Sequence, residues 1–443
     1  MKRALVVGLG LSGRAAALLL QRAGWAVRIN DRADETTLAT EVAHLPAGVE
    51  RIFGGHPAGV LDDVALVVAS PGVPWHLALL DEARSLGIEV IAEVELAARH
   101  LGAAKIAGVT GSNGKTTTTA LLGEICRAAG WRTGVGGNIG DAAACDLALA
   151  GDLEAVVLEL SSFQLEGCTT LKPSVALFLN LSPDHLDRHA GVDAYLAAKA
   201  RIFAAQDTGD WAIVNADDPA LTNLRPASQL TRFSLVDPAA EAHLAGPILV
   251  LDGAALLARE ELPLLGDHNV ANALAAALGA ARLGVPRETI AQALRSFQPL
   301  AHRHQLVAEG SGIRFVDDSK GTNIGATAAG LAGYPPGSIH LILGGLGKDQ
   351  DFTGLRAAVS GRVARVYLIG RDGDKIGKAL AGCVPIEGCA TLDEAVRRAV
   401  AYARAGDTVL LSPACASFDQ FRSYAHRGDD FARIARATVG GDT

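Results

Sequence analysis

The chain has 443 residues, of which 49% are hydrophobic and 20% are charged, and its formal net charge is −8. This length suggests roughly three domains, and the apolar content suffices for packed cores, so extended disorder is excluded. A negative chain without a basic stripe is not expected to bind nucleic acid. The six cysteines form neither a Cys-x-x-Cys pair nor a disulfide framework, which indicates a reducing cytosol and a cytoplasmic protein.

The amino terminus begins with Lys2-Arg3 and an apolar run, as secretory signals do. Arg14 interrupts that run, and the same residues fit a strand, a glycine turn and a helix better. No uncharged apolar stretch of about 20 residues occurs without a Gly or Pro break, so no membrane span is predicted.

Short apolar segments alternate with helical patterns, as in parallel sheets with crossover helices. We predict an α/β protein with Rossmann-like domains at 1–98 and 301–443, flanking a P-loop ATPase-type parallel sheet at 99–300. The second boundary follows from Pro299, because proline disfavours helix in the residue before it. In chain order, strands are expected at 5–8, 27–30, 66–70, 106–109, 156–160, 175–180, 339–343, 366–369 and 408–412. Helices are expected at 12–23, 93–100, 115–129, 195–203, 269–283, 289–297 and 392–404.

The first glycine motif is Gly8-Leu-Gly-Leu-Ser-Gly13, which follows a strand and opens a helix. Asp31 ends the next strand, 18 residues after Gly13. This nearly matches the dinucleotide fingerprint, in which glycines approach phosphates and an acid binds ribose. Alone it indicates an NAD enzyme, whereas beside the loop described next it indicates a second nucleotide site. A tight turn without a ligand is the alternative.

The most informative motif is Gly111-Ser-Asn-Gly-Lys-Thr-Thr117, between a strand and a helix. Its glycines let backbone N–H groups close on phosphate oxygens, and the helix N-terminus adds further donors. Lys115 would reach the β and γ phosphates, and the Thr116 hydroxyl is placed to bind Mg²⁺. Val109 stands where the usual phosphate loop has glycine. A nucleotide triphosphate site is predicted, with an ordinary strand–turn–helix corner as the alternative.

Polar residues follow the next two strands. Glu159 ends one of them, where an acid beside a phosphate loop can hold Mg²⁺. Asp184, His185 and Asp187 follow the other and could reach the same crevice. Lys199 lies within the helix at 195–203, and its pattern alone predicts a solvated lysine.

The last third of the chain places polar residues at strand ends. Asn269 and Asn272 lie three apart on one helix face, where they could cap the helix or contact a base. Asp318 or Ser319 could cap the helix that follows the strand before them. Cations and hydroxyls at such strand ends would suit an anionic substrate. The other residues of interest in these turns are Arg303, Lys320, Thr322, Lys348, Ser417 and Phe418.

Six motifs in this order resemble the Mur ligase family, and the resemblance runs from Gly8 to about residue 428 of the chain. The motifs are Thr110-Gly-Ser-Asn-Gly-Lys-Thr-Thr117, Leu158-Glu-Leu-Ser-Ser-Phe-Gln164, Asp184-His-Leu-Asp187, His268-Asn-x-x-Asn272, Asp318-Ser-Lys-x-Thr-Asn323 and Ser412-Pro-Ala-Cys-Ala-Ser417. Each is weak alone, whereas the ordered set is specific. The resemblance implies an ATP-dependent amide ligase of peptidoglycan precursor synthesis, hence of cell shape and division. The implied ligase would act through an acyl phosphate and release ADP and phosphate.

Within the family the motifs are most similar to those of the member that joins D-glutamate to UDP-N-acetylmuramoyl-L-alanine, and a monomer is expected. The resemblance implies a UDP-sugar site in domain 1–98, an ATP site in domain 99–300, and nucleotide and amino-acid contacts in domain 301–443. Implied ATP contacts are Gly111, Ser112, Asn113, Gly114, Lys115, Thr116, Thr117, Asn269, Asn272, Arg303 and Asp318. Implied UDP-sugar contacts are Ser12, Asp31, Arg32, Ser70, Asn138, Ser161 and Gln164. Implied D-glutamate contacts are Lys320, Thr322, Lys348, Ser417 and Phe418.

The resemblance also implies two Mg²⁺ sites, with Thr116, Glu159 and His185 as ligands. Lys199 matches the lysine that the family carbamylates with CO₂, and a carbamate would add an anionic oxygen ligand. The implied catalytic residues are Lys115, His185, Lys199 and Lys348.

Four residues depart from the family pattern, and several other functions stay open. His304 and Gln305 replace an aromatic residue and an acid, while Asp317 stands where Asn is common and Gly321 where Ala is common. One alternative is an amide ligase that adds another amino acid, and another is a folylpolyglutamate synthetase. A nicotinamide-dependent dehydrogenase using residues 8–13 and a non-catalytic nucleotide-binding regulator are the alternatives from other classes.

Overall fold

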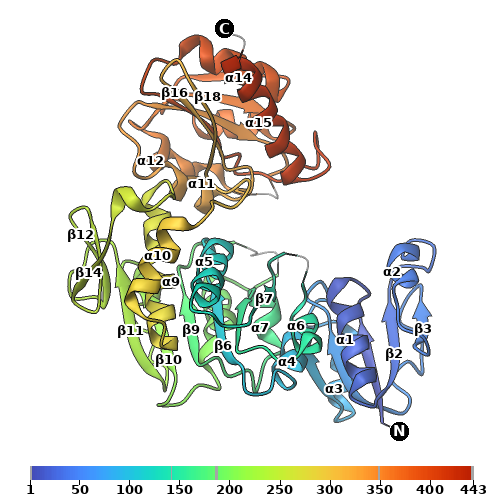
Figure 1. Ribbon diagram of the computed structural model, residues 1–443. Helices are drawn as coiled ribbons and strands as arrows, with labels where there is room; N and C mark the ends of the chain where they lie inside the picture. The colour runs from blue at the N-terminus through green and yellow to red at the C-terminus, as the bar shows by residue number, and fades with distance from the viewer. Residues whose placement is uncertain (1, 141, 185–187, 348–349, 441–443) are drawn as a thin grey trace. The chain divides into compact units, whose positions relative to one another are not determined.

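The computed structural model describes residues 2–140, 142–184, 188–347 and 350–440. These residues form three sheets covered by helices, which confirms the predicted α/β class (Figure 1). The chain divides into two compact units, one with the first two sheets and one with the third. Residues 258–272, which include the start of α9 (Asp267–Leu283), belong to the second unit, and residues 273–294 return to the first. Ser182–Asp184 belongs to the second unit. The predicted limits at 98 and 300 stay a prediction.

The amino-terminal sheet is parallel, with strand order β3-β2-β1-β4-β5. Apolar side chains of β1 (Arg3–Val7) and β4 (Val64–Ala69) are mostly buried, because helices and loops cover both faces of a parallel sheet. A glycine turn leads from β1 into α1 (Leu11–Arg22), which confirms the predicted strand, turn and helix. The other elements are β2 (Ala26–Asp31), β3 (Glu50–Phe53), β5 (Glu89–Ala92), α2 (Ala39–Ala43), α3 (Ala78–Ser85) and α4 (Glu93–Ala98).

The middle sheet has strand order β14-β13-β12-β11-β10-β9-β6-β8-β7 and is parallel from β7 to β12. β12 and β13 pair antiparallel, an extension that the sequence patterns did not predict. Its strands are β6 (Lys105–Thr110), β7 (Thr133–Gly137), β8 (Ala155–Glu159), β9 (Val175–Phe178), β10 (Trp211–Asn215), β11 (Gln229–Ser234), β12 (Ala242–Ala245), β13 (Ile248–Leu251) and β14 (Ala254–Ala258). Its helices are α5 (Lys115–Ala128), α6 (Ala144–Ala150), α7 (Ser162–Glu166), α8 (Val192–Ala200), α9 and α10 (Arg287–Ser296), with short 3₁₀ turns at Arg201–Phe203, Pro219–Leu221 and Arg259–Glu261.

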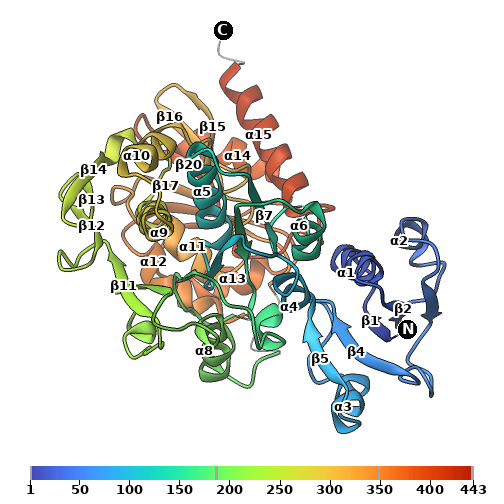
Figure 2. The same cartoon turned by 60° about the horizontal axis from the view of Figure 1, so that its bottom comes forward.

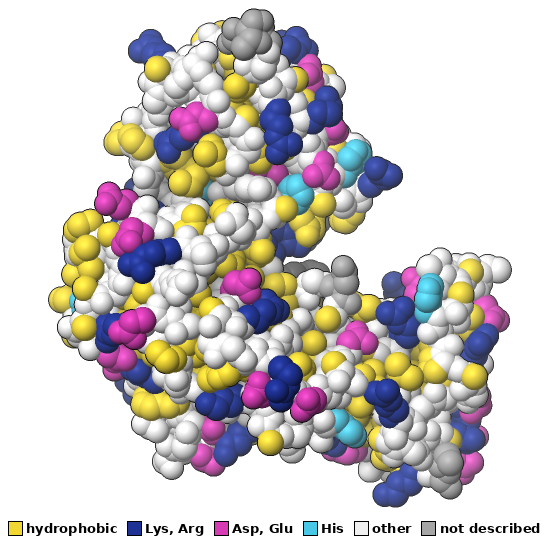
Figure 3. All heavy atoms as spheres, in the orientation of Figure 1, with side chains coloured by type: hydrophobic (Ala, Val, Ile, Leu, Met, Phe, Trp, Pro, Cys, Tyr) yellow, Lys and Arg dark blue, Asp and Glu magenta, His cyan; other side chains and the backbone are white. Residues whose placement is uncertain are grey.

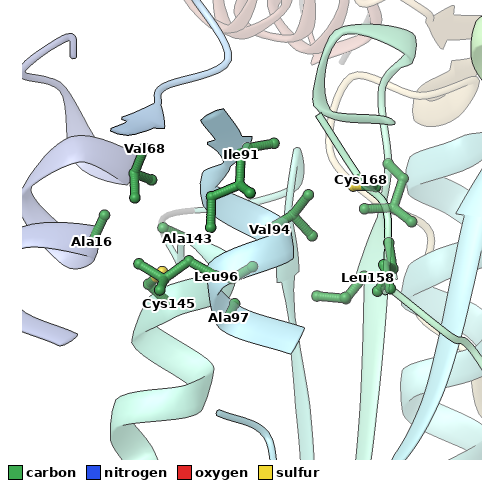
Figure 4. Packing of buried hydrophobic residues seen from close by; sticks show 14 of the residues in the cluster. Ala16, Val68, Ile91, Val94, Leu96, Ala97, Ala143, Cys145, Leu158 and Cys168 are labelled. Atoms are coloured by element: carbon green, nitrogen blue, oxygen red, sulfur yellow. The ribbon is translucent and has the colours of Figure 1, made fainter. Parts of the chain in front are cut away.

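The first two sheets share one hydrophobic core within the first unit. Helices α4 and α6 pack on each other and on α1, and Figures 1 and 2 show the three side by side. Figure 4 shows Ala16 and Val68 of the first sheet layer in the same cluster as Cys145 and Leu158 of the second. The Glu95 carboxylate adds polar contacts, because it accepts hydrogen bonds from three consecutive backbone N–H groups at 169–171.

The third sheet makes up most of the second unit, in the order β15-β16-β20-β17-β18-β19. Its first two strands form an antiparallel hairpin and the remaining pairs are parallel. The strands are β15 (Gln305–Gly310), β16 (Ile313–Asp317), β17 (Ile339–Gly344), β18 (Val363–Ile369), β19 (Ile386–Gly388) and β20 (Thr408–Leu411). The helices are α11 (Ile324–Leu331), α12 (Arg356–Val359), α13 (Gly373–Ala379), α14 (Leu392–Tyr402) and α15 (Tyr424–Gly440), with a 3₁₀ turn at Phe352–Leu355.

All predicted strands and helices are present, with ends that differ by a few residues. The predicted cap of the helix after β16 is wrong. α11 begins at Ile324, and its cap is Asn323, whose side-chain oxygen accepts a hydrogen bond from the Ala326 N–H at 2.7 Å. Among the described residues, none of the helices combines the length and apolar character that crossing a membrane requires. On the face shown in Figure 3, basic and acidic side chains are interspersed.

Candidate functional site

The loop between β6 and α5 has the geometry of a phosphate-binding turn. Gly114 is the N-cap of α5 and adopts φ +82°, a left-handed conformation that glycine tolerates without strain. The Lys115 ammonium donates to the carbonyl oxygens of Gly111 and Ser112, both at 2.9 Å. The ammonium therefore lies over the loop, at the N-terminus of α5, where an anion is stabilised by the helix dipole and N–H donors.

A carboxylate and a hydroxyl meet beside this loop. The Thr116 Oγ1 hydroxyl donates to Glu159 Oε2 at 2.7 Å, and the Asn138 amide donates to Glu159 Oε1 at 2.9 Å. Glu159 is 2% exposed, so its carboxylate does not face bulk solvent. Hydroxyl, carboxylate and amide oxygens are the ligand types that suit Mg²⁺.

Lys199, near the end of α8, contacts the same loop. It is 1% exposed, and its ammonium donates to the Gly111 carbonyl at 2.7 Å. The solvated lysine expected from the helical pattern alone is therefore wrong. Its Nζ atom also lies 4.5 Å from the centroid of the buried Tyr195 ring. The pattern could not reveal this, because α8 turns its last residues toward the phosphate loop.

A cavity of about 880 Å³ opens at the carboxyl ends of the first sheet and reaches the middle sheet. We call it the amino-terminal cavity. The six predicted UDP-sugar residues that line it are Ser12, Asp31, Arg32, Ser70, Asn138 and Gln164. The seventh, Ser161, is not among its lining residues and instead caps α7, where its side chain and that of Gln164 form a capping box. His56, which the sequence patterns did not single out, also lines the cavity and hydrogen-bonds Asn30.

The glycine turn after β1 is held by two of these residues. Asp31 accepts hydrogen bonds from the Leu9 N–H at 2.7 Å and the Ala33 N–H at 2.9 Å. The Ser70 hydroxyl donates to the Gly8 carbonyl at 2.8 Å. Both side chains thus shape the turn as well as the cavity wall.

In the second unit, Asp318 lies at the carboxyl end of β16. Its carboxylate accepts a hydrogen bond from the Ser412 hydroxyl at 2.7 Å, and burial raises the pKa of Asp318 to about 7. A Cβ on Gly321 would lie 2.6 Å from this carboxylate, so a glycine at this departure from the family pattern gives Asp318 more room.

Three loops of the third sheet are joined by one buried arginine. Arg427 is 1% exposed and donates to the backbone carbonyls of Ser319 at 2.8 Å and Cys415 at 3.1 Å. It also reaches the Gly344 carbonyl at 3.5 Å, and burial lowers the pKa of Arg427 to about 10. The sequence carries no motif for this role, because the arginine lies in an ordinary helical pattern.

The predicted amino-acid contacts within the described residues lie on two of these loops. Lys320 follows Ser319 and its ammonium stands 4.0 Å from the Tyr424 ring centroid, while the Thr322 N–H donates to the Lys320 carbonyl. The Ser417 side chain is 2% exposed, and its hydroxyl has no hydrogen-bond partner within the described part of the chain. Phe418 beside it is 70% exposed.

Two other departures from the family pattern, Asp317 and His304, involve histidine side chains. His302 Nδ1 lies 2.7 Å from the fully buried carboxylate of Asp317, and this hydrogen bond raises the pKa of His302. His304 is buried, and burial lowers its pKa well below the usual range. Its Nε2 atom hydrogen-bonds the Tyr334 hydroxyl at 2.8 Å. A neutral histidine and a tyrosine thus fill a position where an aromatic residue was expected.

The two asparagines lie on α9, where Asn269 donates to the Leu265 carbonyl at 2.8 Å and Asn272 donates to Asn269 at 3.1 Å. Arg303 lies in the turn before β15 in the second unit. His185 and Lys348 fall outside the described residues.

The architecture and the phosphate turn define a nucleotide-dependent α/β protein, and family comparisons specify its class. Three family models match the chain: the MurD-like N-terminal domain at residues 2–92, the Mur ligase middle domain at 109–280, and the glutamate ligase domain at 302–415. Together they cover most of the sequence. The chain belongs to the Mur ligase family.

Two similar proteins carry the same name. A UDP-N-acetylmuramoylalanine–D-glutamate ligase of Anaeromyxobacter dehalogenans is 46% identical over 450 residues, covering 98% of this chain and 97% of the relative. The enzyme of the same name from Acidobacterium capsulatum is 44% identical, covering 99% and 97%. Each alignment spans nearly the full length of both proteins.

Solved structures of the family share the fold at low identity. MurF of Acinetobacter baumannii superposes with a TM-score of 0.64 at 18% identity, covering 97% of this chain and 93% of that one. MurF of Thermotoga maritima, solved in complex with ADP, gives 0.64 at 16% identity, covering 94% and 96%.

Proposed function

We propose that this chain joins D-glutamate to UDP-N-acetylmuramoyl-L-alanine, with ATP converted to ADP and phosphate. The observation that carries the proposal is the double role of Asn138. This side chain lines the amino-terminal cavity and also donates to Glu159, which accepts the Thr116 hydroxyl of the phosphate loop. A carboxylate at the end of a cavity-bound substrate would therefore lie close to the ATP phosphates.

In this reaction the substrate's terminal carboxylate oxygen takes the γ-phosphoryl group of ATP, and ADP leaves. The amine of D-glutamate then attacks the acyl carbon, inorganic phosphate departs, and an amide remains. Lys115 and the N–H groups of the loop hold the β and γ phosphates and stabilise the charge that develops on them. The enzyme must hold anionic reactants together, and two unit charges about 4 Å apart repel by roughly 4 kcal/mol at an effective dielectric near 20. Cationic groups beside the reactants offset this repulsion.

Thr116 and Glu159 would hold Mg²⁺, and His185 is proposed for the second ion. The oxygen ligands present beside the loop fit this metal. When bound, Mg²⁺ neutralises phosphate charge and so favours phosphoryl transfer. We also propose a carbamate on Lys199. A carbamate keeps one N–H on Nζ, so the hydrogen bond to the Gly111 carbonyl could persist, and the carbamate oxygens would supply further metal ligands.

D-Glutamate is proposed to bind on the third sheet, at Lys320, Thr322, Lys348, Ser417 and Phe418. Two cations suit its carboxylates, and the unpaired Ser417 hydroxyl within the described chain offers a donor. Asn269, Asn272, Arg303 and Asp318 are proposed as nucleotide contacts. We further propose that the enzyme acts as a monomer.

Coupled phosphate release tests the function directly. Purified enzyme receives ATP, Mg²⁺ and UDP-N-acetylmuramoyl-L-alanine, with D-glutamate, L-glutamate or no amino acid. Of the three reactions, we expect only the one with D-glutamate to release phosphate and ADP, in equal amounts. Formation of AMP, product formation without ATP consumption, or turnover with a different amino acid instead would overturn the proposal, the last outcome in favour of a sister ligase.

A further inference from the structure

A single arginine connects the two walls of the amino-terminal cavity. Arg188 belongs to the middle domain, yet its guanidinium donates to two backbone carbonyls of the first domain, Pro71 at 3.3 Å and Val73 at 3.0 Å. Both residues line the cavity, together with the segment between them. The predicted sugar contact Ser70 immediately precedes them.

The same guanidinium also contacts helix α7. Its Cζ atom lies 3.9 Å from the centroid of the Phe163 ring, and Nη2 lies 3.5 Å from the Glu166 carboxylate. α7 also carries Gln164, which lines the cavity from the middle-domain side. Arg188 thus lies between one wall of the cavity and the helix that bears the other.

This support is itself firmly packed. The buried His189 ring stacks on Phe163, with centroids 5.6 Å apart and an interplanar angle of 21°. Its Nε2 atom hydrogen-bonds the Ser162 hydroxyl at 2.9 Å. The Phe163 ring therefore contacts both the His189 imidazole and the Arg188 guanidinium, which ties Arg188 to α7.

We propose that Arg188 is a positioning residue for the UDP-linked substrate, which sets the separation of the two cavity walls. The inference rests on the proposed function only in taking that substrate as the cavity's occupant. The residue touches no reacting atom. It acts by holding the 71–73 segment at a fixed distance from Gln164, so that both walls contact one ligand at the same time.

Arginine suits this task better than lysine. Its planar guanidinium can donate to two diverging carbonyls and stack on an aromatic ring at the same time, whereas an ammonium is a point charge with no stacking face. Arg188→Lys therefore keeps the positive charge but removes the planar group that donates to two carbonyls and stacks on Phe163. Arg84→Lys is a matched control, because Arg84 also donates to a carbonyl, that of Trp75, and stacks on the Trp75 ring, but within the first domain alone.

The test measures KM for UDP-N-acetylmuramoyl-L-alanine and for ATP in both variants, and the Kd of the UDP-linked substrate by calorimetry without ATP. For Arg188→Lys we expect KM and Kd of the UDP-linked substrate to rise about tenfold, with KM for ATP and the melting temperature nearly unchanged. Arg84→Lys is expected to leave all four values near wild type. A general structural defect would instead lower the melting temperature and affect both substrates.

Unchanged KM and Kd in a folded Arg188→Lys enzyme would overturn the inference, as would equal effects on both substrates. If that variant does not fold, Phe163→Leu, which removes the ring that contacts the guanidinium, serves in its place. A normal KM for the UDP-linked substrate in this variant refutes the positioning role of Arg188, and a raised KM supports it. Failure of wild-type enzyme to bind the UDP-linked substrate is a separate result, which refutes the proposed function and with it this inference.

Discussion

The Thr116 hydroxyl and the Glu159 carboxylate are hydrogen-bonded at 2.7 Å, although 43 residues separate them in the chain. Parallel strands bring their carboxyl ends to one edge of the sheet, and the phosphate loop follows one such strand while Glu159 ends its neighbour. An oxygen pair that a metal can bridge is thus built by topology.

Glu159→Gln is expected to raise the Mg²⁺ concentration needed for half-maximal activity by at least about tenfold, because an amide is a weaker ligand than a carboxylate. The Asn138 and Thr116 hydrogen bonds can partly survive with an amide, so the fold is retained. Activity measured over a Mg²⁺ titration checks this. An unchanged titration midpoint would remove Glu159 from the metal site.

Lys115→Ala is expected to lower kcat about a hundredfold or more, since the cation facing the ATP phosphates is lost. Lys105→Ala is the control: this lysine begins the same strand, far from the loop, and donates to the Leu283 carbonyl. The control should retain activity. Phosphate release at wild-type rate from Lys115→Ala would contradict the assignment of this loop.

Lys199→Ala is expected to be nearly inactive and to bind Mg²⁺ more weakly. In wild-type enzyme supplied with ¹³C-bicarbonate, we expect a carbamate carbon signal in the NMR spectrum that Lys199→Ala lacks. A wild-type enzyme that is fully active after removal of CO₂, and that shows no such signal, would refute the carbamate.

The buried Glu93 is expected to make stability depend on pH. Burial raises the pKa of Glu93 to about 7, and its carboxyl accepts a hydrogen bond from the Cys145 N–H. Since the folded state holds this proton more tightly than the unfolded state, its contribution is full at low pH and is lost as pH rises from about 4.5 to about 7. Glu93→Gln should therefore gain stability relative to wild type between pH 5 and 8, by up to about 3 kcal/mol.

Urea unfolding of wild type and variant at several pH values measures that difference. Glu82→Gln, at an exposed position of α3, is the control and should show little pH dependence relative to wild type. A constant difference between Glu93→Gln and wild type across this range would show that Glu93 does not hold a proton in the folded state.

Asp317→Asn is expected to lower the pKa of His302, because the hydrogen bond to Asp317 is the main cause that raises it. The stabilisation from this pair is full below the ordinary histidine pKa and is lost as pH rises through the raised value. Histidine ring signals in an NMR pH titration measure the shift. Asp429→Asn, whose exposed carboxylate lies 3.7 Å from His302, should have a smaller effect.

The sequence predicted the fold class and the phosphate loop well, because periodic apolar strands and glycine turns are local signals. It did not predict Arg188, since nothing local distinguishes an arginine that reaches a carbonyl 115 residues away from one in solvent. The same holds for Arg427 and for the burial of Lys199. These positions depend on how distant elements pack, which hydrophobic periodicity does not encode.

The Glu95 carboxylate, buried against the turn at 169–171, has a thermodynamic consequence. Cutting the chain after α4 would leave this acid without its three N–H donors and would bring Val94 and Leu96 into water. Two segments that family models treat as separate domains should therefore melt in a single calorimetric transition. The limit between these two family-model matches is therefore not expected to separate two independently folding units.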